Sequence, residues 1–475
     1  MEGLEVSILN FKDILIDNEN KRIDSEYFKK QFLQFFQNVP NLRSLGSFVK
    51  SGYRVVYENT KIINKEEAEE KEFPIFLQAA DLETPFIRTE NLFHVDNVDW
   101  ERYPKGRISK GEILIEVKGK IDKVAIVPDD FPEKTLVTGS LFKLTVNEKI
   151  SKNVLLTYLI SKYGVAFKER YKTNLLISFI SKPDLYRIPV PSFSKEFETK
   201  IDDSYTKIFD FQKSSKQLYT QAEELLLETL GLQNFATSRE AVNVKSLKES
   251  FLSSGRLDAE YYQPKYEDLF NHITNTNHKV LGSLVNIKKS VEPGSSAYQE
   301  EGIPFMRVSN LNKFGISDPE IYLDSILFDD VIRPKKDVIL LSKDGSIGIA
   351  YKAEKDLNCI TSGAILHLEV ESNEVLPDYL TLVLNSLIVK LQAERDSGGS
   401  IIQHWKPSEI QKVIIPIIEK KIQQQIADLI QKSFALKAAS EELLETSKRA
   451  VEIAIEENEE TALAFISKNT KSYGH

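Results

Sequence analysis

Several short, turn-rich segments of this 475-residue chain carry side chains that can hydrogen-bond to nucleic acid. Arg, Lys, Asn and Gln can read the edges of bases, and Ser, Thr and Lys can bind phosphates. In the second half these segments are 288–298, 307–310, 342–346, 395–400 and 403–405, and in the first half 50–54, 78–81, 118–120 and 170–174. Any one of these side chains could be solvated loop surface, but the set predicts a DNA-binding face.

The candidate DNA contacts are basic, amide, hydroxyl and aromatic side chains of these segments. They are Lys50, Tyr53, Arg54, Lys118, Lys120, Arg170 and Lys172 in the first half, and Lys288, Lys289, Ser295, Tyr298, Arg307, Ser309, Asn310, Lys343, Ser346, Arg395, Ser400 and Gln403 in the second. We expect the groups at 307–310, 343–346 and 395–403 to lie on one face, because each adjoins a strand-like run.

The sequence gives weaker evidence for enzyme chemistry. Pro183-Asp184 followed by Glu198-Thr199-Lys200 has the loose spacing of a metal-dependent endonuclease, in which paired carboxylates and a lysine hold Mg²⁺. However, Glu198 and Lys200 fall on the first turns of a predicted long helix, and the matching helix carries Gln423 and Gln425. The chain contains no G-x-G-x-x-G, P-loop, G-x-S-x-G or Asn-Pro-Pro-aromatic motif. We therefore predict no catalytic residues, no metal and no cofactor in this chain.

The composition fits a globular protein with its own cores. Apolar residues make up 41% and charged residues 28%, and no apolar run is long enough to span a membrane. The start, MEGLEVSILN, has no secretory pattern, so a cytoplasmic location is expected. The single cysteine, Cys359, is expected to be buried, and the six histidines have no metal-ligand spacing. The net charge of −9 argues mildly against nucleic acid, but acidic residues are concentrated at 66–70 and 441–460.

The two halves repeat the same sequence features in the same order. Arg22-Ile23-Asp24-Ser25-Glu26-Tyr27-Phe28 returns as Arg256-Leu257-Asp258-Ala259-Glu260-Tyr261-Tyr262, and Phe73-Pro74-Ile75-Phe76 returns as Ile303-Pro304-Phe305-Met306. Short strand-like runs at 111–117, 123–127, 141–146 and 186–191 follow a helical stretch at 26–36, and a second helical stretch covers 153–163. The second half copies this order, which predicts an α/β (α+β) fold with two similar globular domains.

Each half ends in a long helix with a repeat of about 3.5 residues. Ile201, Tyr205 and Ile208 begin the first repeat, and Ile422, Ile426 and Leu429 begin the second. This spacing is typical of a coiled-coil seam, although each helix could instead pack on its own domain. The predicted division is 1–195 for the first domain, 196–235 for its helix, 236–418 for the second domain, 419–462 for its helix and 463–475 for a flexible tail.

The order of these motifs resembles the specificity subunit of Type I restriction–modification enzymes. Gly302-Ile303-Pro304 through Leu311, Gly345-Ser346-Ile347-Gly348, and Ile415-Pro416 leading to Gln423-Gln424-Gln425 are similar to motifs of that family. The first half is a more divergent copy, because it carries Phe197-Glu198-Thr199 where the second half has the glutamines.

The resemblance implies a non-catalytic protein of phage defence. Two target recognition domains, in inverted orientation on an antiparallel coiled coil, would each read half of a bipartite double-stranded DNA target. DNA methyltransferase subunits would supply S-adenosylmethionine and adenine-N6 methylation, and restriction/translocase subunits would supply cleavage. A stand-alone Mg-dependent endonuclease and a two-headed protein–protein scaffold are the alternatives that the residues leave open.

Overall fold

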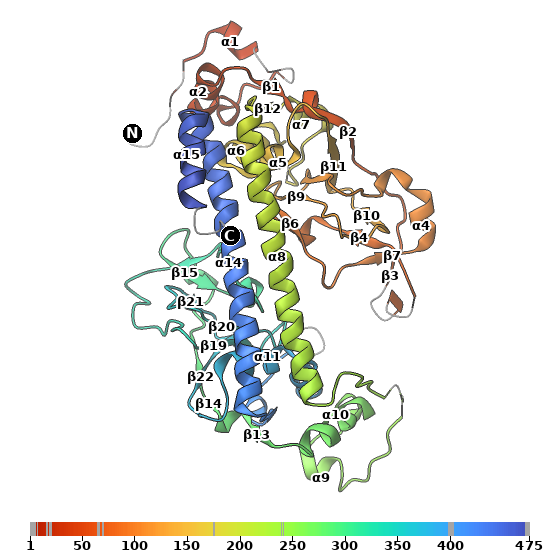
Figure 1. Ribbon diagram of the computed structural model, residues 1–475. Coiled ribbons are helices and arrows are strands. Elements are labelled where there is room, and N and C mark those ends of the chain that lie inside the picture. Colours follow the sequence, from red (N-terminus) through yellow and green to blue (C-terminus); the bar gives the residue numbers. More distant parts are fainter. Residues whose placement is uncertain are drawn as a thin grey trace. The chain divides into compact units, whose positions relative to one another are not determined.

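The computed structural model describes residues 6, 8–15, 18, 21–63, 67–68, 71–173, 176–238, 240, 242–397 and 403–470. Its contacts divide the chain into two compact units (Figure 1). Unit 1 comprises residues 1–210 and 439–475, and unit 2 comprises residues 211–438. The helices α8 (Lys195–Thr229) and α14 (Lys420–Glu456) each contribute to both units, so this division differs from the predicted one, in which each helix was a separate segment.

Unit 1 alternates short strands and short helices before α8. Its helices are α1 (Phe11–Leu15), α2 (Lys30–Asn38), α4 (Asn97–Arg102), α5 (Lys152–Ile160), α6 (Lys162–Tyr171), α7 (Lys182–Arg187) and, after α14, α15 (Glu459–Asn469). Its strands are β1 (Arg43–Ser44), β2 (Val49–Tyr53), β3 (Ile62–Ile63), β4 (Ile75–Leu77), β5 (Leu82–Glu83), β6 (Phe86–Ile87), β7 (His94–Val95), β8 (Ile113–Glu116), β9 (Val124–Ile126), β10 (Thr135–Val137), β11 (Leu141–Val146) and β12 (Pro189–Val190).

Unit 2 has a similar order between α8 and α14. Its helices are α9 (Phe251–Ser254), α10 (Pro264–Thr274), α11 (Pro377–Asn385), α12 (Leu387–Asp396) and α13 (Pro407–Ile410). Its strands are β13 (His278–Val280), β14 (Val285–Lys289), β15 (Ile303–Met306), β16 (Leu311–Asn312), β17 (Gly315–Ile316), β18 (Tyr322–Leu323), β19 (Ile339–Ser342), β20 (Ala350–Lys352), β21 (Ile360–Thr361), β22 (Ile365–Val370) and β23 (Ile414–Pro416).

Each unit is built on a four-stranded antiparallel sheet. The strand order is β2-β11-β8-β9 in unit 1 and β14-β22-β19-β20 in unit 2. The strands β8 and β19 are buried along their whole length, which explains why their sequences are apolar runs without alternation. Each unit also has a parallel strand pair in a second sheet, β4 with β10 in unit 1 and β15 with β21 in unit 2. The strand predictions at 111–117, 123–127 and 141–146 agree with β8, β9 and β11.

The repeated Arg-x-Asp motif is structural in both units. Arg22 binds Asp24 with an Nε–Oδ2 distance of 2.7 Å, and its Nη1 donates to the carbonyl of Arg170 at the end of α6. Arg256 binds Asp258 with an Nη2–Oδ2 distance of 2.6 Å, and its Nη1 donates to the carbonyl of Asp396 at the end of α12. The arginine therefore neutralises exposed carbonyls at a helix C-terminus and ties the start of each repeat to its helix pair.

The glutamines of the second half also have a structural counterpart. Gln423 is fully buried, and its Oε1 accepts a hydrogen bond of 2.9 Å from the amide of Leu376, directly before α11. In unit 1, Glu198 Oε1 accepts a hydrogen bond of 3.2 Å from the amide of Ser151, directly before α5. A carboxylate oxygen accepts as an amide oxygen does, so the loss of the glutamine in the first half preserves this contact.

The long helices contact each other within each unit. In unit 2, Ser433 Oγ donates to the carbonyl of Ser215 at 2.8 Å, and in unit 1, Ser440 Oγ donates to the carbonyl of Ile208 at 3.0 Å. These serines are buried, and their backbone partners satisfy the hydroxyls without requiring larger side chains.

Two predicted boundaries are wrong. Tyr186 and Arg187 belong to α7, and only Pro189–Val190 of the predicted strand pairs, with β1. The last long helix ends at Glu456 rather than 462, and α15 continues the described chain as helix to Asn469. The side chains of Ala462 and Ile466 are fully buried, so most of the described part of the predicted flexible tail is packed helix. Among the described residues, no helix combines the length and apolarity needed to cross a membrane.

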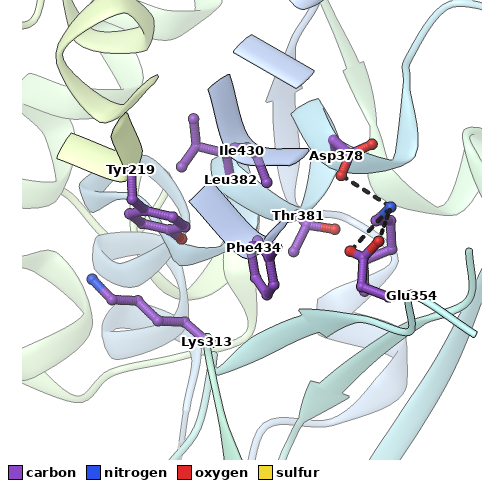
Figure 2. A pocket seen from close by; sticks show the side chains of 9 residues that line it. Tyr219, Lys313, Glu354, Asp378, Thr381, Leu382, Ile430 and Phe434 are labelled. Atoms are coloured by element: carbon purple, nitrogen blue, oxygen red, sulfur yellow. Dashed lines mark hydrogen bonds and ion pairs between the residues drawn. The ribbon is translucent and has the colours of Figure 1, made fainter. Parts of the chain in front are cut away.

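Unit 2 contains a buried ion pair beneath the long helices. Lys352 Nζ lies 3.0 Å from Asp378 Oδ1 and 3.2 Å from Glu354 Oε1 (Figure 2). Gln431 of α14 donates to Asp378 Oδ2. The side chains of Lys352 and Asp378 are 6% and 7% exposed. Burial lowers the pKa of Lys352, but the neighbouring carboxylates outweigh it, so the pKa lies above the ordinary value and the amine stays charged.

Replacing Lys352 by Ala should therefore destabilise unit 2 by about 3–5 kcal/mol, because it leaves the Asp378 carboxylate buried without its cation. Lys352→Met combined with Asp378→Leu should recover most of this loss. Lys335→Ala is the control, since the 3.1 Å pair of Lys335 with Asp356 is exposed and should contribute less than about 1 kcal/mol. Urea unfolding followed by the fluorescence of the buried Trp405, in a Trp100→Phe background, measures these differences. Equal losses for Lys352→Ala and Lys335→Ala would contradict this assignment.

Candidate nucleic-acid interface

A three-residue segment of unit 2, Ser362–Ala364, gathers the candidate loops. We call it the hub segment. The Ser362 amide donates to the carbonyl of Met306 at 2.8 Å, and the Gly363 amide donates to the carbonyl of Val291 at 2.9 Å. The carbonyl of Ala364 accepts from the amide of Lys343 at 2.9 Å. The loops that follow β14, β15 and β19 are thus attached by main-chain bonds to one short segment.

A second set of main-chain bonds attaches the segment 403–405 to the loop after β19. The Gly345 amide donates to the carbonyl of Gln403 at 2.9 Å, and the Trp405 amide donates to the carbonyl of Lys343 at 2.8 Å. Asp344 and His404 are directly opposite each other in this bridge. Trp405 is 1% exposed and anchors the segment in the core. The structure therefore brings Lys343, Ser346 and Gln403 together.

Unit 1 has counterparts of four of these five main-chain bonds. The amide of Thr138 donates to the carbonyl of Leu77, and the carbonyl of Ser140 accepts from the amide of Val117, both at 2.9 Å. In the second set, Gly119 donates to the carbonyl of Ser178 at 3.1 Å, and Ile180 donates to the carbonyl of Val117 at 3.0 Å.

These bonds correct the sequence alignment of the two halves. Leu77 and Met306 accept equivalent bonds, so the prolines of Phe73-Pro74-Ile75-Phe76 and Ile303-Pro304-Phe305-Met306 do not occupy equivalent positions. An alignment that pairs Pro74 with Pro304 is therefore shifted by one residue from the alignment given by the main-chain bonds. A one-residue shift in a strand exchanges its two faces, so main-chain partners are the better guide here.

Most of the candidate DNA contacts lie at the surface. The exposed ones are Lys50, Tyr53, Lys118, Lys120, Lys288, Lys289, Ser295, Tyr298, Arg307, Ser309, Ser346 and Gln403. Gly363 allows a close approach here, because a Cβ on it would lie 2.8 Å from Lys289 Cε. Lys289 therefore lies over the hub segment. Ser400 is outside the described residues.

Other candidates are partly occupied by partners within their own unit. Arg54 Nε donates to the carbonyl of Gly139 at 2.5 Å, and its guanidinium lies 4.8 Å from the Phe179 ring centroid. Asn310 Oδ1 accepts from the amide of Arg307 at 3.0 Å, so this side chain shapes its turn. Lys288 Nζ lies 2.6 Å from Glu369 Oε1, and Lys172 pairs with Glu169.

The prediction of DNA contact is wrong for Arg170, whereas for Arg395 it stays a prediction. Arg170 is 4% exposed, and its guanidinium lies 4.2 Å from the centroid of Tyr27. Arg395 is half-buried, with its guanidinium 4.0 Å from the centroid of Phe270 and its Nε 2.8 Å from Asp396 Oδ1. Cation–π contacts with core rings hold Arg170 inside unit 1, so it is not placed to reach DNA. Arg395 is engaged by Phe270 and Asp396 within unit 2, and its contact with DNA stays a prediction.

The sequence reasoning missed the pair formed by Asp344 and His404. His404 Nδ1 lies 2.8 Å from Asp344 Oδ1, and Lys343 binds the same carboxylate. Burial raises the pKa of Asp344, but the hydrogen bonds from Lys343 and His404 outweigh it and place the pKa below the ordinary value. Because the two residues are 60 positions apart, no spacing in the sequence could indicate the pair.

The central strand beneath this region carries a buried histidine. His367 lies opposite Lys288 in the sheet, and its Nε2 is 2.8 Å from Thr361 Oγ1. Burial lowers the pKa of His367 to about 4. The imidazole is therefore neutral at pH 7 and adds no charge beneath the exposed lysines.

The nuclease-like carboxylates have separate structural partners. Asp184 Oδ2 accepts from Ser181 Oγ at 2.6 Å in the first turn of α7. Glu198 is buried and accepts from the amide of Ser151, as described above. Within the described part of the chain, no group of three or more His, Cys, Asp or Glu side chains could hold a metal ion. Cys359 is buried as predicted, and burial raises its pKa to about 11.

Comparison with known proteins identifies the second half of the chain. Residues 275–446 match the family model of the Type I restriction modification DNA specificity domain. A comparison with curated protein sequences gives no match.

Solved structures of low sequence identity are also similar. The Type-I restriction-modification system S subunit from M. genitalium is 17% identical, with 90% of this chain and 96% of that chain covered and a TM-score of 0.35. The HsdS subunit from Thermoanaerobacter tengcongensis is 14% identical, with coverages of 90% and 96% and a TM-score of 0.27. Both scores lie below 0.5, so the assignment depends on the family model. Residues 275–446 are thus similar to Type I restriction modification DNA specificity domains.

Proposed function

We propose that this chain is the non-catalytic DNA-specificity subunit of a Type I restriction–modification complex. The family match over residues 275–446 is the observation that carries the proposal. The same residues contain the hub segment and the exposed loop side chains that it gathers. Arg, Lys, Gln and Ser on loops attached to a rigid sheet can provide base and phosphate contacts without any catalytic group.

Two recognition domains would each read half of a bipartite double-stranded DNA target. The repeated strand orders and the repeated main-chain bonds support an internal repeat. The side chains at equivalent loop positions differ, for example Lys118 in unit 1 and Asp344 in unit 2. Identical scaffolds with different loop side chains are suited to reading two different sequences.

The long helices would form an antiparallel two-helix coiled coil that links the two domains as an inverted repeat. Ser194, directly before α8, binds Glu459, the first residue of α15, and Ile208 contacts Ser440. The paired residues advance in opposite directions along the two helices within unit 1, which supports antiparallel pairing. In unit 2, Ser215 pairs with Ser433, so the two helices are also in contact there.

Partner subunits would supply the chemistry. DNA methyltransferase subunits would bring S-adenosylmethionine, and restriction/translocase subunits would join through them. The stretch 441–460 has eight acidic and two basic residues. An acidic surface of this kind repels phosphate, which favours contact with protein or solvent there. DNA cleavage by the isolated chain with Mg²⁺ would contradict the proposal and favour an endonuclease.

Exchanging residues 236–418 for the corresponding domain of another family member should change one half of the recognised sequence. The reason is that the loop contacts of each unit are internal to that unit. Selection of bound duplexes from a randomised pool, with the methyltransferase partner present, measures the result. A change in both halves would show that the two units do not read DNA independently.

Arg307 and Lys289 should have different roles in binding. Arg307→Ala should cost about 1–3 kcal/mol at one base pair and relax the choice there, as loss of a base contact does. Lys289→Ala should weaken binding to all sequences alike. It should also reduce the slope of log affinity against log salt concentration by about the contribution of one phosphate contact. Titrations of cognate and altered duplexes at two salt concentrations separate the two effects. Lys288→Ala is the matched control and should have a smaller effect, because Glu369 already binds that amine.

Deleting one heptad from both long helices should shorten the unspecified spacer of the target. Seven residues at about 1.5 Å per residue correspond to roughly 10 Å, or about 3 base pairs. The spacer is measured by the same selection from randomised duplexes. An unchanged spacer in a folded variant would show that the helices do not set the distance.

A further inference from the structure

The bridge between the loop after β19 and the segment 403–405 places two side chains opposite each other. In unit 2 these are Asp344 and His404, and in unit 1 the equivalent bridge has Lys118 opposite Phe179. The main-chain bonds that flank the two bridges match, because Gly345 in unit 2 and Gly119 in unit 1 donate from the same position. The backbone is shared, but the chemistry of the paired side chains is different.

In unit 2 the pair is a histidine oriented by a carboxylate. Asp344 is held on one side by Lys343 and on the other by His404 Nδ1, at 2.8 Å from Oδ1. An ionised carboxylate can only accept, so Nδ1 must carry the proton. In the neutral imidazole, Nε2 is then a hydrogen-bond acceptor. The His404 side chain is 61% exposed, whereas Asp344 is 23% exposed.

The backbone beneath His404 is well fixed. The next residue, Trp405, is 1% exposed, and its amide binds the carbonyl of Lys343. The residue before, Gln403, accepts from Gly345. An exposed acceptor is therefore presented from a position held on both sides, which is what selective recognition requires.

In unit 1 the same position has the opposite character. Lys118 is exposed and donates hydrogen bonds only, and Phe179 is covered by the guanidinium of Arg54 at 4.8 Å from the ring centroid. Together these groups present cations and an apolar ring. Unit 1 therefore offers donors at the place where unit 2 offers an acceptor.

We propose that positions 344 and 404 form a specificity-determining pair, in which His404 Nε2 accepts a hydrogen bond from the exocyclic amino group of an adenine or cytosine. In the major groove, adenine N6 and cytosine N4 are donors, whereas guanine O6 and thymine O4 are acceptors. At the contacted position, an acceptor at His404 therefore selects adenine or cytosine over guanine or thymine. This inference rests on the proposed DNA-binding function of unit 2.

The test begins with the full-length chain assembled with its methyltransferase partner. Bound duplexes are selected from a randomised pool with the parent, His404→Ala, Asp344→Asn, and the double variant Asp344→Lys with His404→Phe, which grafts the unit 1 pair. The parent should prefer adenine or cytosine at one position that the His404→Ala variant no longer discriminates. The grafted variant should lose that preference at the same position and leave the other half of the target unchanged.

A second measurement removes the amino group from the DNA. Purine replaces the preferred adenine, or 2-pyrimidinone replaces the preferred cytosine, and affinities are titrated. The parent should lose about three- to tenfold in affinity, as expected for one hydrogen bond. His404→Ala should lose nothing further on the modified duplex. His278→Ala is the matched control, because this histidine bonds to the backbone of Thr276 and should leave the selected sequence unchanged.

The outcomes separate the inference from the function on which it rests. If the parent selects no sequence, the proposed function itself is wrong. If the parent selects a sequence and His404→Ala selects the same one, the specificity role of His404 is wrong. If His404→Ala weakened binding to every DNA sequence equally, His404 would be assigned to a phosphate contact, and the inference would also be overturned. Thermal unfolding of each variant checks that the exposed substitutions leave the fold intact.

Discussion

The main-chain bonds of the hub segment are the constraint on which the candidate interface depends. Through Met306, Val291 and Lys343 they hold three loops whose positions in the sequence are far apart. Backbone amides and carbonyls form these bonds, so the loop side chains can change without loosening the loops. Unit 1 shows the result, because it keeps two of the three corresponding bonds, from Thr138 to Leu77 and from Val117 to Ser140, but carries other side chains.

Two buried cations of this protein are satisfied within their own units. Arg170 stacks on core rings, and Lys352 pairs with Asp378. Desolvation of an ion is costly unless partners replace the water, so each of these groups is fully engaged. Lys289 and Arg307 are exposed cations that belong to the loops around the hub segment. This separation distinguishes basic residues that hold the fold from basic residues suited to phosphate or bases.

Much of the local structure could be predicted from the sequence. Apolar runs between turn residues identified β8, β9 and β11, and the 3.5-residue spacing identified α8 and α14. The boundaries were less accurate. Tyr186 and Arg187 are helical because the Ser181 side chain caps the N-terminus of α7. The chain breaks between α14 and α15 near Asn458, and the Asn458 side chain caps the N-terminus of α15. Such short caps are weak signals beside the longer periodic patterns.

The sequence by itself determined the order of elements, the repeated halves and the set of polar loops, because these follow from local periodicity and turn residues. Only the tertiary structure decided which loop residues meet. Arg170 looks like the other loop cations in sequence, but nearby aromatic rings hold it in the core of unit 1. Asp344 and His404 are 60 positions apart and become partners through a bridge of main-chain bonds. Contacts between residues far apart in the chain depend on the packing of the whole unit, and a single sequence does not record that packing.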